Sequence, residues 1–181
     1  MEIVQAGETI SLHELIYFEL NPSVGDVMDL TDAARRSEVQ FAVDKASDYL
    51  ISRQKSARQV RDYLVKKEFS PDVADEAVAR LKDLGLIDDE AFARLYIEST
   101  HGERGNRYLE QKLRERGIRD VFLPEEDPET VCRILEKRWG VSGISTQKDR
   151  LKAQNFLLSR GFSHETIRKA LRMYENLESN R

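Results

Sequence analysis

A leucine and a second large apolar residue recur together three times along this chain, and this repeat limits the folds that the chain can adopt. The three leucines are spaced 49 and 44 residues apart, and each is followed five positions later by its apolar partner. The pairs are Leu64 with Phe69, Leu113 with Ile118, and Leu157 with Phe162. Spacings of this size are typical of helical repeat arrays, whose units bury little core alone and are stabilised by stacking on their neighbours.

Each repeat is predicted to contain three helices, because its apolar residues recur at helical spacing between capping signals. The first helices of the three repeats are expected over residues 32–53, 89–101 and 128–139. The second helices are expected over residues 57–68, 105–116 and 147–160. The third helices are expected over residues 71–84, a stub near 119–123, and 164–176.

These segments predict an all-α fold: an elongated, curved array of three tandem three-helix repeats. The expected domains are an acidic N-terminal segment over residues 1–31, repeat one over 32–86, repeat two over 87–126 with a shortened third helix, and repeat three over 127–181. In the N-terminal segment, the stretch ETISLHELIYFELNPSVGDVM begins with apolar alternation and ends in turn residues. It predicts one or two short strands or an irregular hairpin.

Four side chains are predicted to cap helix N-termini. Ser56 has Gln59 three residues after it, which is a capping-box pattern, and Ser70 precedes a proline that suits the first helical position. The four expected caps are Ser56, Ser70, Asp88 and Ser163.

The stretch GLIDDEAFARLY, residues 85–96, allows three interpretations of its carboxylates: metal ligands, a catalytic acid–base set, or a helix start. The apolar residues that follow lie on one helical face, so Asp88 is placed to accept hydrogen bonds from first-turn N–H groups. Asp89 and Glu90 would then lie where the helix dipole favours negative charge. A metal would need further ligands, and neither the three histidines nor the lone Cys132 shows ligand spacing. Helix capping is the favoured interpretation.

The composition and the missing motifs favour a binding protein. The single Cys132 cannot form an internal disulfide, and no apolar run approaches the roughly 18 residues of a spanning helix, so we expect a soluble, cytoplasmic protein without a membrane segment. No phosphate-binding loop, dinucleotide fingerprint, zinc-protease or nucleophile-elbow motif occurs, so we expect neither catalysis nor a cofactor or metal. The spacing of Gly102 and Gly105 resembles a backbone-clamping loop of RNA-binding modules, but a flexible link between helices is the favoured interpretation.

The charges are unevenly distributed. Residues 1–50 hold three basic and ten acidic residues, whereas residues 51–181 hold 26 basic and 23 acidic residues. The segments 104–119 and 149–175 each contain six basic residues, against two and three acidic ones. Local positive faces of this kind suit an acidic partner, either nucleic acid or a protein surface, although many such faces are only solvated.

Aromatic residues at helical spacing are predicted to pack inside or between the repeats rather than to bind a cofactor. These residues are Tyr49, Tyr63, Phe92, Tyr96, Tyr108, Trp139, Phe156 and Tyr174.

Residues 40–175 resemble the RecX family, bacterial regulators of the RecA recombinase. The resemblance rests first on AVDKASDYLISRQKSARQVRDYLVKKEFSPDVADEAVARLKDLGLIDDEAFARLYIES. It continues through RGNRYLEQKLRERGI and DRLKAQNFLLSRGFSHETIRKAL, in the family's order and spacing. Two features depart from the family: Pro124 and the acidic run after it shorten the second repeat, and the acidic N-terminal forty residues lie outside the matched part.

The resemblance implies a non-enzymatic protein that binds RecA and the RecA–single-stranded DNA filament, and that suppresses strand exchange, ATP hydrolysis and cleavage of the SOS repressor. A monomer with no cofactor and at most weak direct contact with DNA is expected. From their charge and expected exposure, we predict that the contact residues are Arg104, Arg107, Arg114, Arg116, Arg150, Lys152, Arg160, Arg168, Lys169 and Arg172.

Two other binding functions remain open. A direct DNA-binding module would suit three-helix units, but no predicted helix carries the Arg, Asn and Gln cluster that base reading needs. The stretch LLSRGFSHETIRKAL also resembles the loop and closing helix of UBA-like adaptor domains, although the basic helix before it and the two further repeats argue against that function.

Overall fold

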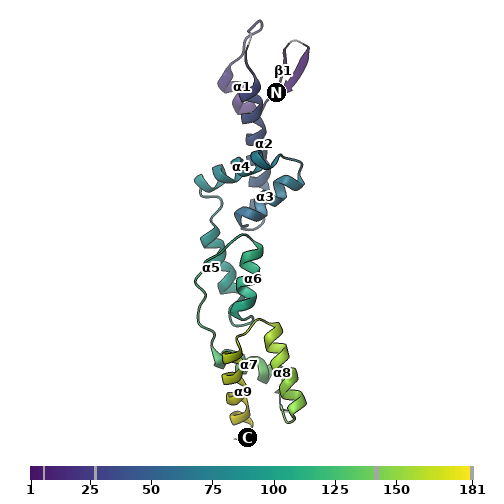
Figure 1. The fold of residues 1–181 in the computed structure, drawn as a ribbon. Coiled ribbons are helices and arrows are strands. Elements are labelled where there is room, and N and C mark those ends of the chain that lie inside the picture. Colours follow the sequence, from purple (N-terminus) through teal and green to yellow (C-terminus); the bar gives the residue numbers. More distant parts are fainter. Residues whose placement is uncertain (6, 27, 141–142, 180–181) are drawn as a thin grey trace. The chain divides into compact units, whose positions relative to one another are not determined.

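The computed structural model describes residues 1–5, 7–26, 28–140 and 143–179, which are mostly helical (Figure 1). The elements are β1 (Glu2–Gln5), β2 (Glu8–Ser11), α1 (Glu14–Leu20), α2 (Thr31–Ile51), α3 (Ala57–Lys66), α4 (Pro71–Asp83), α5 (Asp89–Thr100), α6 (Asn106–Glu115), α7 (Pro128–Trp139), α8 (Gln147–Ser159) and α9 (His164–Ser179). The chain divides into two compact units, Met1–Phe92 and Ala93–Arg181. The predicted helical fold with a small N-terminal hairpin is confirmed.

The hairpin lies nearer the N-terminus than the sequence pattern indicated. Strands β1 and β2 pair antiparallel with Ile3 opposite Ile10, and both isoleucines pack on a small core around Leu12. The apolar run that follows was predicted to be extended, and this prediction is wrong, because residues 14–20 form α1. Its inward-facing residues Ile16 and Leu20 are four positions apart, which is a helical period.

His13 explains where α1 begins. Its ring Nδ1 accepts a hydrogen bond from the Leu15 N–H at 3.2 Å, so the imidazole acts as the helix cap. Because Nδ1 accepts, the proton of the neutral ring lies on Nε2, which is 2.8 Å from Asp44 Oδ2 on α2. One imidazole therefore caps α1 and joins it to α2.

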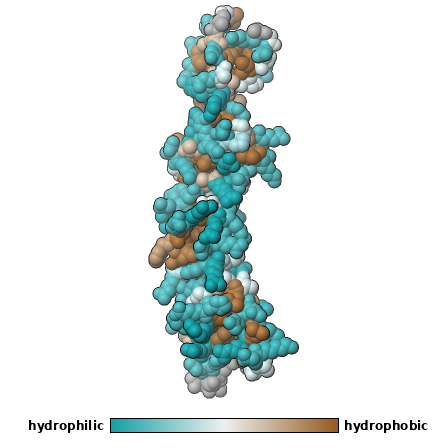
Figure 2. Space-filling view, in the orientation of Figure 1, coloured by the Kyte–Doolittle hydropathy of each residue, from teal (hydrophilic) through white to brown (hydrophobic). Residues whose placement is uncertain are grey.

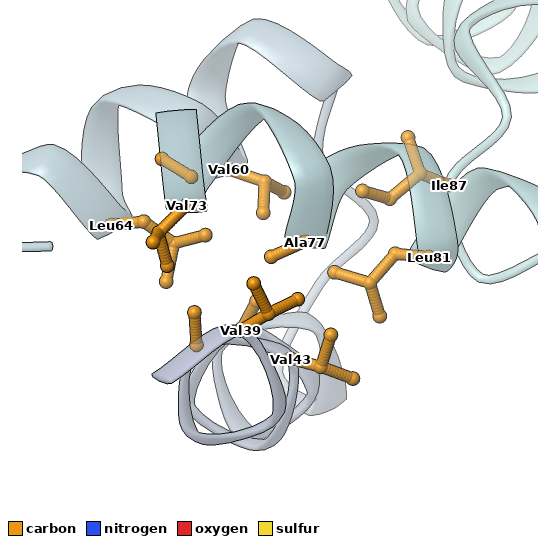
Figure 3. Packing of buried hydrophobic residues seen from close by; sticks show 11 residues of the cluster. Val39, Val43, Val60, Leu64, Val73, Ala77, Leu81 and Ile87 are labelled. Carbon is orange, nitrogen blue, oxygen red and sulfur yellow. The ribbon is translucent and has the colours of Figure 1, made fainter. Parts of the chain in front are cut away.

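The main core of the first unit forms where α3 and α4 pack against α2 (Figure 3). Figure 3 shows Val39 and Val43 of α2 pointing toward the side chains of the other helices. The buried residues are Val39, Ala42, Val43, Ala46, Val60, Leu64, Val73, Ala74, Ala77, Leu81 and Ile87. Burying each of the larger side chains, the valines, leucines and isoleucine, contributes about 1.5–3 kcal/mol, so this cluster is a major source of the unit's stability.

The start of α3 is fixed by side chains from two places in the chain. Ser56 and Gln59 form a reciprocal capping box, with the Ser56 hydroxyl accepting from the Gln59 N–H at 3.3 Å. The next amide, of Ala57, donates to Asp89 Oδ1 at 2.8 Å, and the other carboxylate oxygen lies 3.1 Å from Lys82 Nζ. Asp89 therefore stabilises α3 as well as beginning α5.

In the second unit, α7, α8 and α9 surround a core of their own. The shared buried residues are Val131, Cys132, Leu135, Ile144, Ala153, Leu157, Phe162, Ile167, Ala170, Leu171 and Tyr174. The Tyr174 hydroxyl donates to the Gly140 carbonyl at 3.1 Å, which satisfies the polar end of a buried ring. The repeated leucines Leu64, Leu113 and Leu157 are all buried, as the repeat predicts.

The expected helical stub at residues 119–123 is absent, and this prediction is wrong. Gly117 ends the turn after α6, Asp120 adopts a left-handed φ of 55°, and Pro124 follows four residues later. Too few residues remain between these breakers for a helical turn. Val121 and Leu123 instead line a hollow of about 580 Å³ beside Leu113.

Gly105, which was interpreted as part of a flexible link, is buried in a backbone-to-backbone contact. Its N–H donates to the Arg160 carbonyl at 3.0 Å, and the Arg107 N–H donates to the Gly161 carbonyl at 3.1 Å. A Cβ on Gly105 would lie 2.3 Å from the carbonyl carbon of Gly161. Only glycine fits here, and the flexible-link interpretation of this residue is wrong.

Glu126 adds a side-chain connection near the contact between the Gly105 and Gly161 loops. Its two carboxylate oxygens accept from the Asn106 N–H at 2.7 Å and from the Ser163 N–H at 2.9 Å. Burial alone would raise the pKa of Glu126, but these backbone hydrogen bonds, with further ones from Thr166 and Ser163 side chains, outweigh burial and lower it. One ionised carboxylate thus connects the start of α6 with the start of α9.

Candidate partner-binding surface

All ten predicted contact residues lie in the second unit, at α6, α8 and α9 or just before and after these helices. Hydrophilic residues cover most of the visible face of the molecule, and apolar patches interrupt them (Figure 2). The ten residues are not equivalent, because the structure gives each a different set of contacts.

Four of the ten are engaged in ion pairs on their own unit. Their nitrogen–oxygen distances lie between 2.5 and 3.0 Å. Such exposed pairs contribute little to stability, about 0–1 kcal/mol, but they partly neutralise the cation that a partner would meet. The pairs are Arg114 with Glu110, Arg150 with Glu175, Lys152 with Asp149, and Lys169 with Glu165.

Two others lie against tyrosine rings near α6. The Arg104 guanidinium carbon is 4.8 Å from the Tyr108 ring centroid, and that of Arg116 is 4.7 Å from the Tyr96 centroid. Arg116 also donates to the Lys112 carbonyl at 2.8 Å. Burial raises the pKa of Tyr96, with Tyr108 as a second cause, so its hydroxyl stays neutral at physiological pH. These arginines are held in place rather than free to sample the solvent.

Three arginines are exposed and are the most accessible of the set. Arg107 lies in the first turn of α6, and Arg168 and Arg172 lie one turn apart on α9. Within the described parts of the chain, no carboxylate forms an ion pair with any of the three.

A second group of cations and rings, at α7 and α8, was not predicted from the sequence. The Arg138 guanidinium carbon lies 4.3 Å from the Phe156 ring centroid, and that of Arg160 lies 4.7 Å from the same centroid. The Trp139 ring meets Phe156 edge-on at 5.6 Å. The run Lys137-Arg138-Trp139 at a helix end places cations beside a ring and could have indicated this group. The sequence does not show, however, that Phe156 of α8 packs against it.

Two hollows open beside this group, and we call them together the α7–α8 cleft. One, of about 570 Å³, is lined by Arg138, Trp139, Lys152 and Phe156. The other, of about 500 Å³, is lined by Glu103, Ile134, Lys137, Arg138, Phe156 and Arg160. The cleft therefore contains four cationic side chains and one carboxylate.

The four predicted caps have the expected hydrogen bonds. Asp88 Oδ1 accepts from the Glu90 and Ala91 N–H groups, both at 2.9 Å. The hydroxyls of Ser56, Ser70 and Ser163 each accept from an amide three residues later, at 3.2–3.3 Å. The carboxylates of residues 88–90 thus begin a helix. Within the described ranges, no three histidine, cysteine or acidic side chains are grouped so that they could hold a metal ion.

None of the described helices has the length and apolar character needed to cross a membrane.

Two family models match the chain. Residues 42–81 match the first three-helix domain of RecX, and residues 125–171 match the third. The crystal structure of a regulatory protein RecX is similar with a TM-score of 0.74 at 20% identity, covering 91% of this chain and 90% of that one. The crystal structure of RecX from Lactobacillus salivarius is similar with a TM-score of 0.66 at 21% identity, covering 76% and 97%. At these identities the two structures support the fold.

Curated relatives named Regulatory protein RecX are similar over most of this chain. The relative from Bacillus subtilis is 32% identical over 91% of this chain and 67% of its own length. The relative from Prosthecochloris aestuarii is 32% identical over 75% of this chain and 94% of its own length. The chain spans only 62% of the relative from Bacillus velezensis. From these matches, the chain belongs to the RecX family of regulatory proteins.

Proposed function

We propose that this protein is a non-enzymatic regulator that acts in the cytoplasm as a monomer. It binds RecA and the RecA–single-stranded DNA filament, and it lowers the recombinase, ATPase and coprotease activities of that filament. It thereby modulates DNA repair and the SOS response. The single observation that carries this proposal is family membership, through relatives that are named regulatory proteins.

The charges of the second unit support an acidic partner. Exposed Arg107, Arg168 and Arg172 offer cations that form no ion pair within the described chain. A nucleoprotein filament presents DNA phosphates along a polymer of repeated protomers, and cations attract such a surface in a salt-dependent way.

The repeats provide a second reason. We propose that the boundaries 32–86, 87–126 and 127–181 delimit three units, and that repeats two and three each contact the filament. Two linked weak contacts bind more tightly than either alone, because the second contact forms at a high effective concentration. A partner that repeats along its length suits such a binder.

Co-sedimentation with RecA filaments tests this proposal. The chain should pellet with filaments at concentrations that leave naked single-stranded DNA uncoated. The double variant Arg168→Glu with Arg172→Glu should weaken filament binding at least about five-fold, from two reversed rim charges. The matched control, Arg53→Glu with Lys66→Glu, makes the same charge change on exposed residues of the first unit and should bind as the wild type does. Equal loss in both variants, or no filament binding by the wild type, contradicts the proposal.

A further inference from the structure

The α7–α8 cleft has an unbalanced charge. Lys137, Arg138, Lys152 and Arg160 line it, with Glu103 as the one carboxylate among its lining residues. Lys152 is paired with Asp149, but no carboxylate of the described residues pairs with Lys137 or Arg138. Since a folded chain gains little by gathering unpaired cations, this group suits an anionic ligand.

The guanidinium groups of the cleft are held in position. Arg138 and Arg160 both lie within 4.7 Å of the Phe156 centroid, and Arg138 also lies 5.3 Å from the Trp139 ring. Arg160 donates a further hydrogen bond to the Glu103 carbonyl at 3.0 Å, which fixes its head group. An arginine that is already ordered loses less conformational entropy when it binds an anion.

The rings favour one class of anionic partner. Nucleobases stack on aromatic rings and on guanidinium planes, whereas an acidic peptide makes no use of a stacking surface. A base can stack only when it is not enclosed in a duplex, and no Asn or Gln lines the cleft to read a base edge in a groove.

We propose that the α7–α8 cleft binds single-stranded nucleic acid directly, with its arginines and lysines on the phosphates and its aromatic and guanidinium surfaces against unpaired bases. This activity goes beyond filament binding, because it needs no RecA. The binding is sequence-tolerant and salt-dependent, as expected when phosphates and stacking supply the contacts.

A tryptophan in the cleft provides an intrinsic fluorescent probe of nucleic-acid binding. Trp139 is the single tryptophan of the sequence, and it lines the cleft. Titrating a thirty-residue oligothymidylate into the full chain should quench the tryptophan fluorescence in a saturable way. Anisotropy of the labelled oligonucleotide gives a second, independent readout of the same affinity.

Arg138→Ala should weaken oligothymidylate binding about five- to twenty-fold, and it should lower the salt slope by about 0.7, the value for one lost contact with a single-strand phosphate. The matched control is Arg133→Ala on the same helix, whose side chain is 71% exposed and lies 3.9 Å from Asp127, outside the cleft. Far-ultraviolet circular dichroism checks that both variants keep their helices. Equal affinities of the two variants would overturn the proposal.

Two further ligands separate the partner classes. A duplex of the same length should bind at least five-fold more weakly than the single strand, and a polyglutamate peptide should not quench Trp139. Quenching by polyglutamate at the same concentrations would instead assign the cleft to an acidic protein segment and overturn the nucleic-acid proposal. Filament co-sedimentation is measured separately. If the wild type binds oligothymidylate but not filaments, only the proposed RecA function is contradicted. If it binds filaments but not oligothymidylate, only this inference is contradicted.

Discussion

At the scale of single residues, the Glu126 carboxylate links two separate segments of the second unit. It accepts from two backbone amides that lie 57 residues apart in sequence, Asn106 and Ser163. Leaving either amide unpaired would cost part of its desolvation free energy. Its lowered pKa means that the folded protein favours the ionised form.

Glu126→Gln should therefore lower the free energy of unfolding by about 1 kcal/mol at pH 7, since the charge-assisted bonds are lost in a partly solvated site. The stabilisation by the wild-type carboxylate is fully present above the ordinary glutamate pKa of 4.5. It is lost as pH falls through the lower pKa of the folded state. Denaturant titrations at pH 7 and pH 3 measure the difference, with exposed Glu125→Gln as the control. A gap between variant and wild type that is unchanged at pH 3 would contradict this assignment.

Gly105 provides a second residue-scale prediction. Gly105→Ala places a methyl group 2.3 Å from backbone atoms of Gly161 and Phe162, so the two loops must separate. We expect a loss of about 3 kcal/mol of stability, at the upper end of the usual cost of overpacking a core. Gly85→Ala is the control, because Gly85 has a φ of 70° with open space around it and should lose only about 1 kcal/mol from backbone strain. Thermal unfolding of the two variants at equal protein concentration measures the difference between their stability losses. Similar losses in both variants would contradict a tight backbone contact at Gly105.

At the scale of elements, the two units start a second helix in the same way. In each, the first amide of that helix donates to a carboxylate at or just before the start of a later helix: Ala57 to Asp89 at the start of α5, and Asn106 to Glu126 two residues before α7. The acceptors lie 32 and 20 residues ahead, because repeat two lacks the third helix that repeat one has. At α3 this contact adds to the local Ser56 cap, whereas at α6, where Gly105 provides no side-chain cap, the Glu126 carboxylate takes the place of one.

Asp89→Ala should therefore destabilise the first unit by about 1–2 kcal/mol, since it leaves the Ala57 amide and the Lys82 ammonium without their acceptor. Asp83→Ala, at an exposed position at the end of α4, should change stability by less than about 0.5 kcal/mol. Native-state hydrogen exchange at the start of α3 locates the effect. Unchanged protection of the Ala57 amide in Asp89→Ala would contradict the assignment.

The sequence predicts elements well where their signals are local. Ser56, Ser70 and Asp88 mark helix starts through their own neighbours, and the helices begin within one residue of the expected positions. Helix α1 was missed because its cap is a histidine and its outward residues Leu15 and Phe18 are apolar, which hides the helical period.

The surface was harder to predict than the fold, for a physical reason. Charge and periodicity identified exposed arginines, but not which of them would have a neighbouring carboxylate or ring. The surroundings of Arg138 are set by Phe156 on another helix, and the need for glycine at position 105 is set by its contact with Gly161. Both depend on tertiary contacts that the local sequence does not show.

At the scale of the whole molecule, the charges separate along the chain. The first 50 residues contain ten acidic and three basic residues, and the predicted contact residues all lie in the second unit. A binder of this kind should depend strongly on ionic strength, because its cations release counterions from the partner's DNA. Raising the salt from 50 to 200 mM should weaken filament binding at least about ten-fold, measured by co-sedimentation. An affinity that does not change with salt would indicate an apolar contact instead.

The most direct test of the regulatory function follows ATP hydrolysis by RecA assembled on single-stranded DNA while the chain is titrated in, with binding to naked DNA measured in parallel. We predict that hydrolysis falls at concentrations well below those that coat free DNA, and that the variant Arg168→Glu with Arg172→Glu needs at least five-fold more protein. If hydrolysis instead falls only as the free DNA becomes coated, or does not fall at all, the chain does not regulate RecA through its filament.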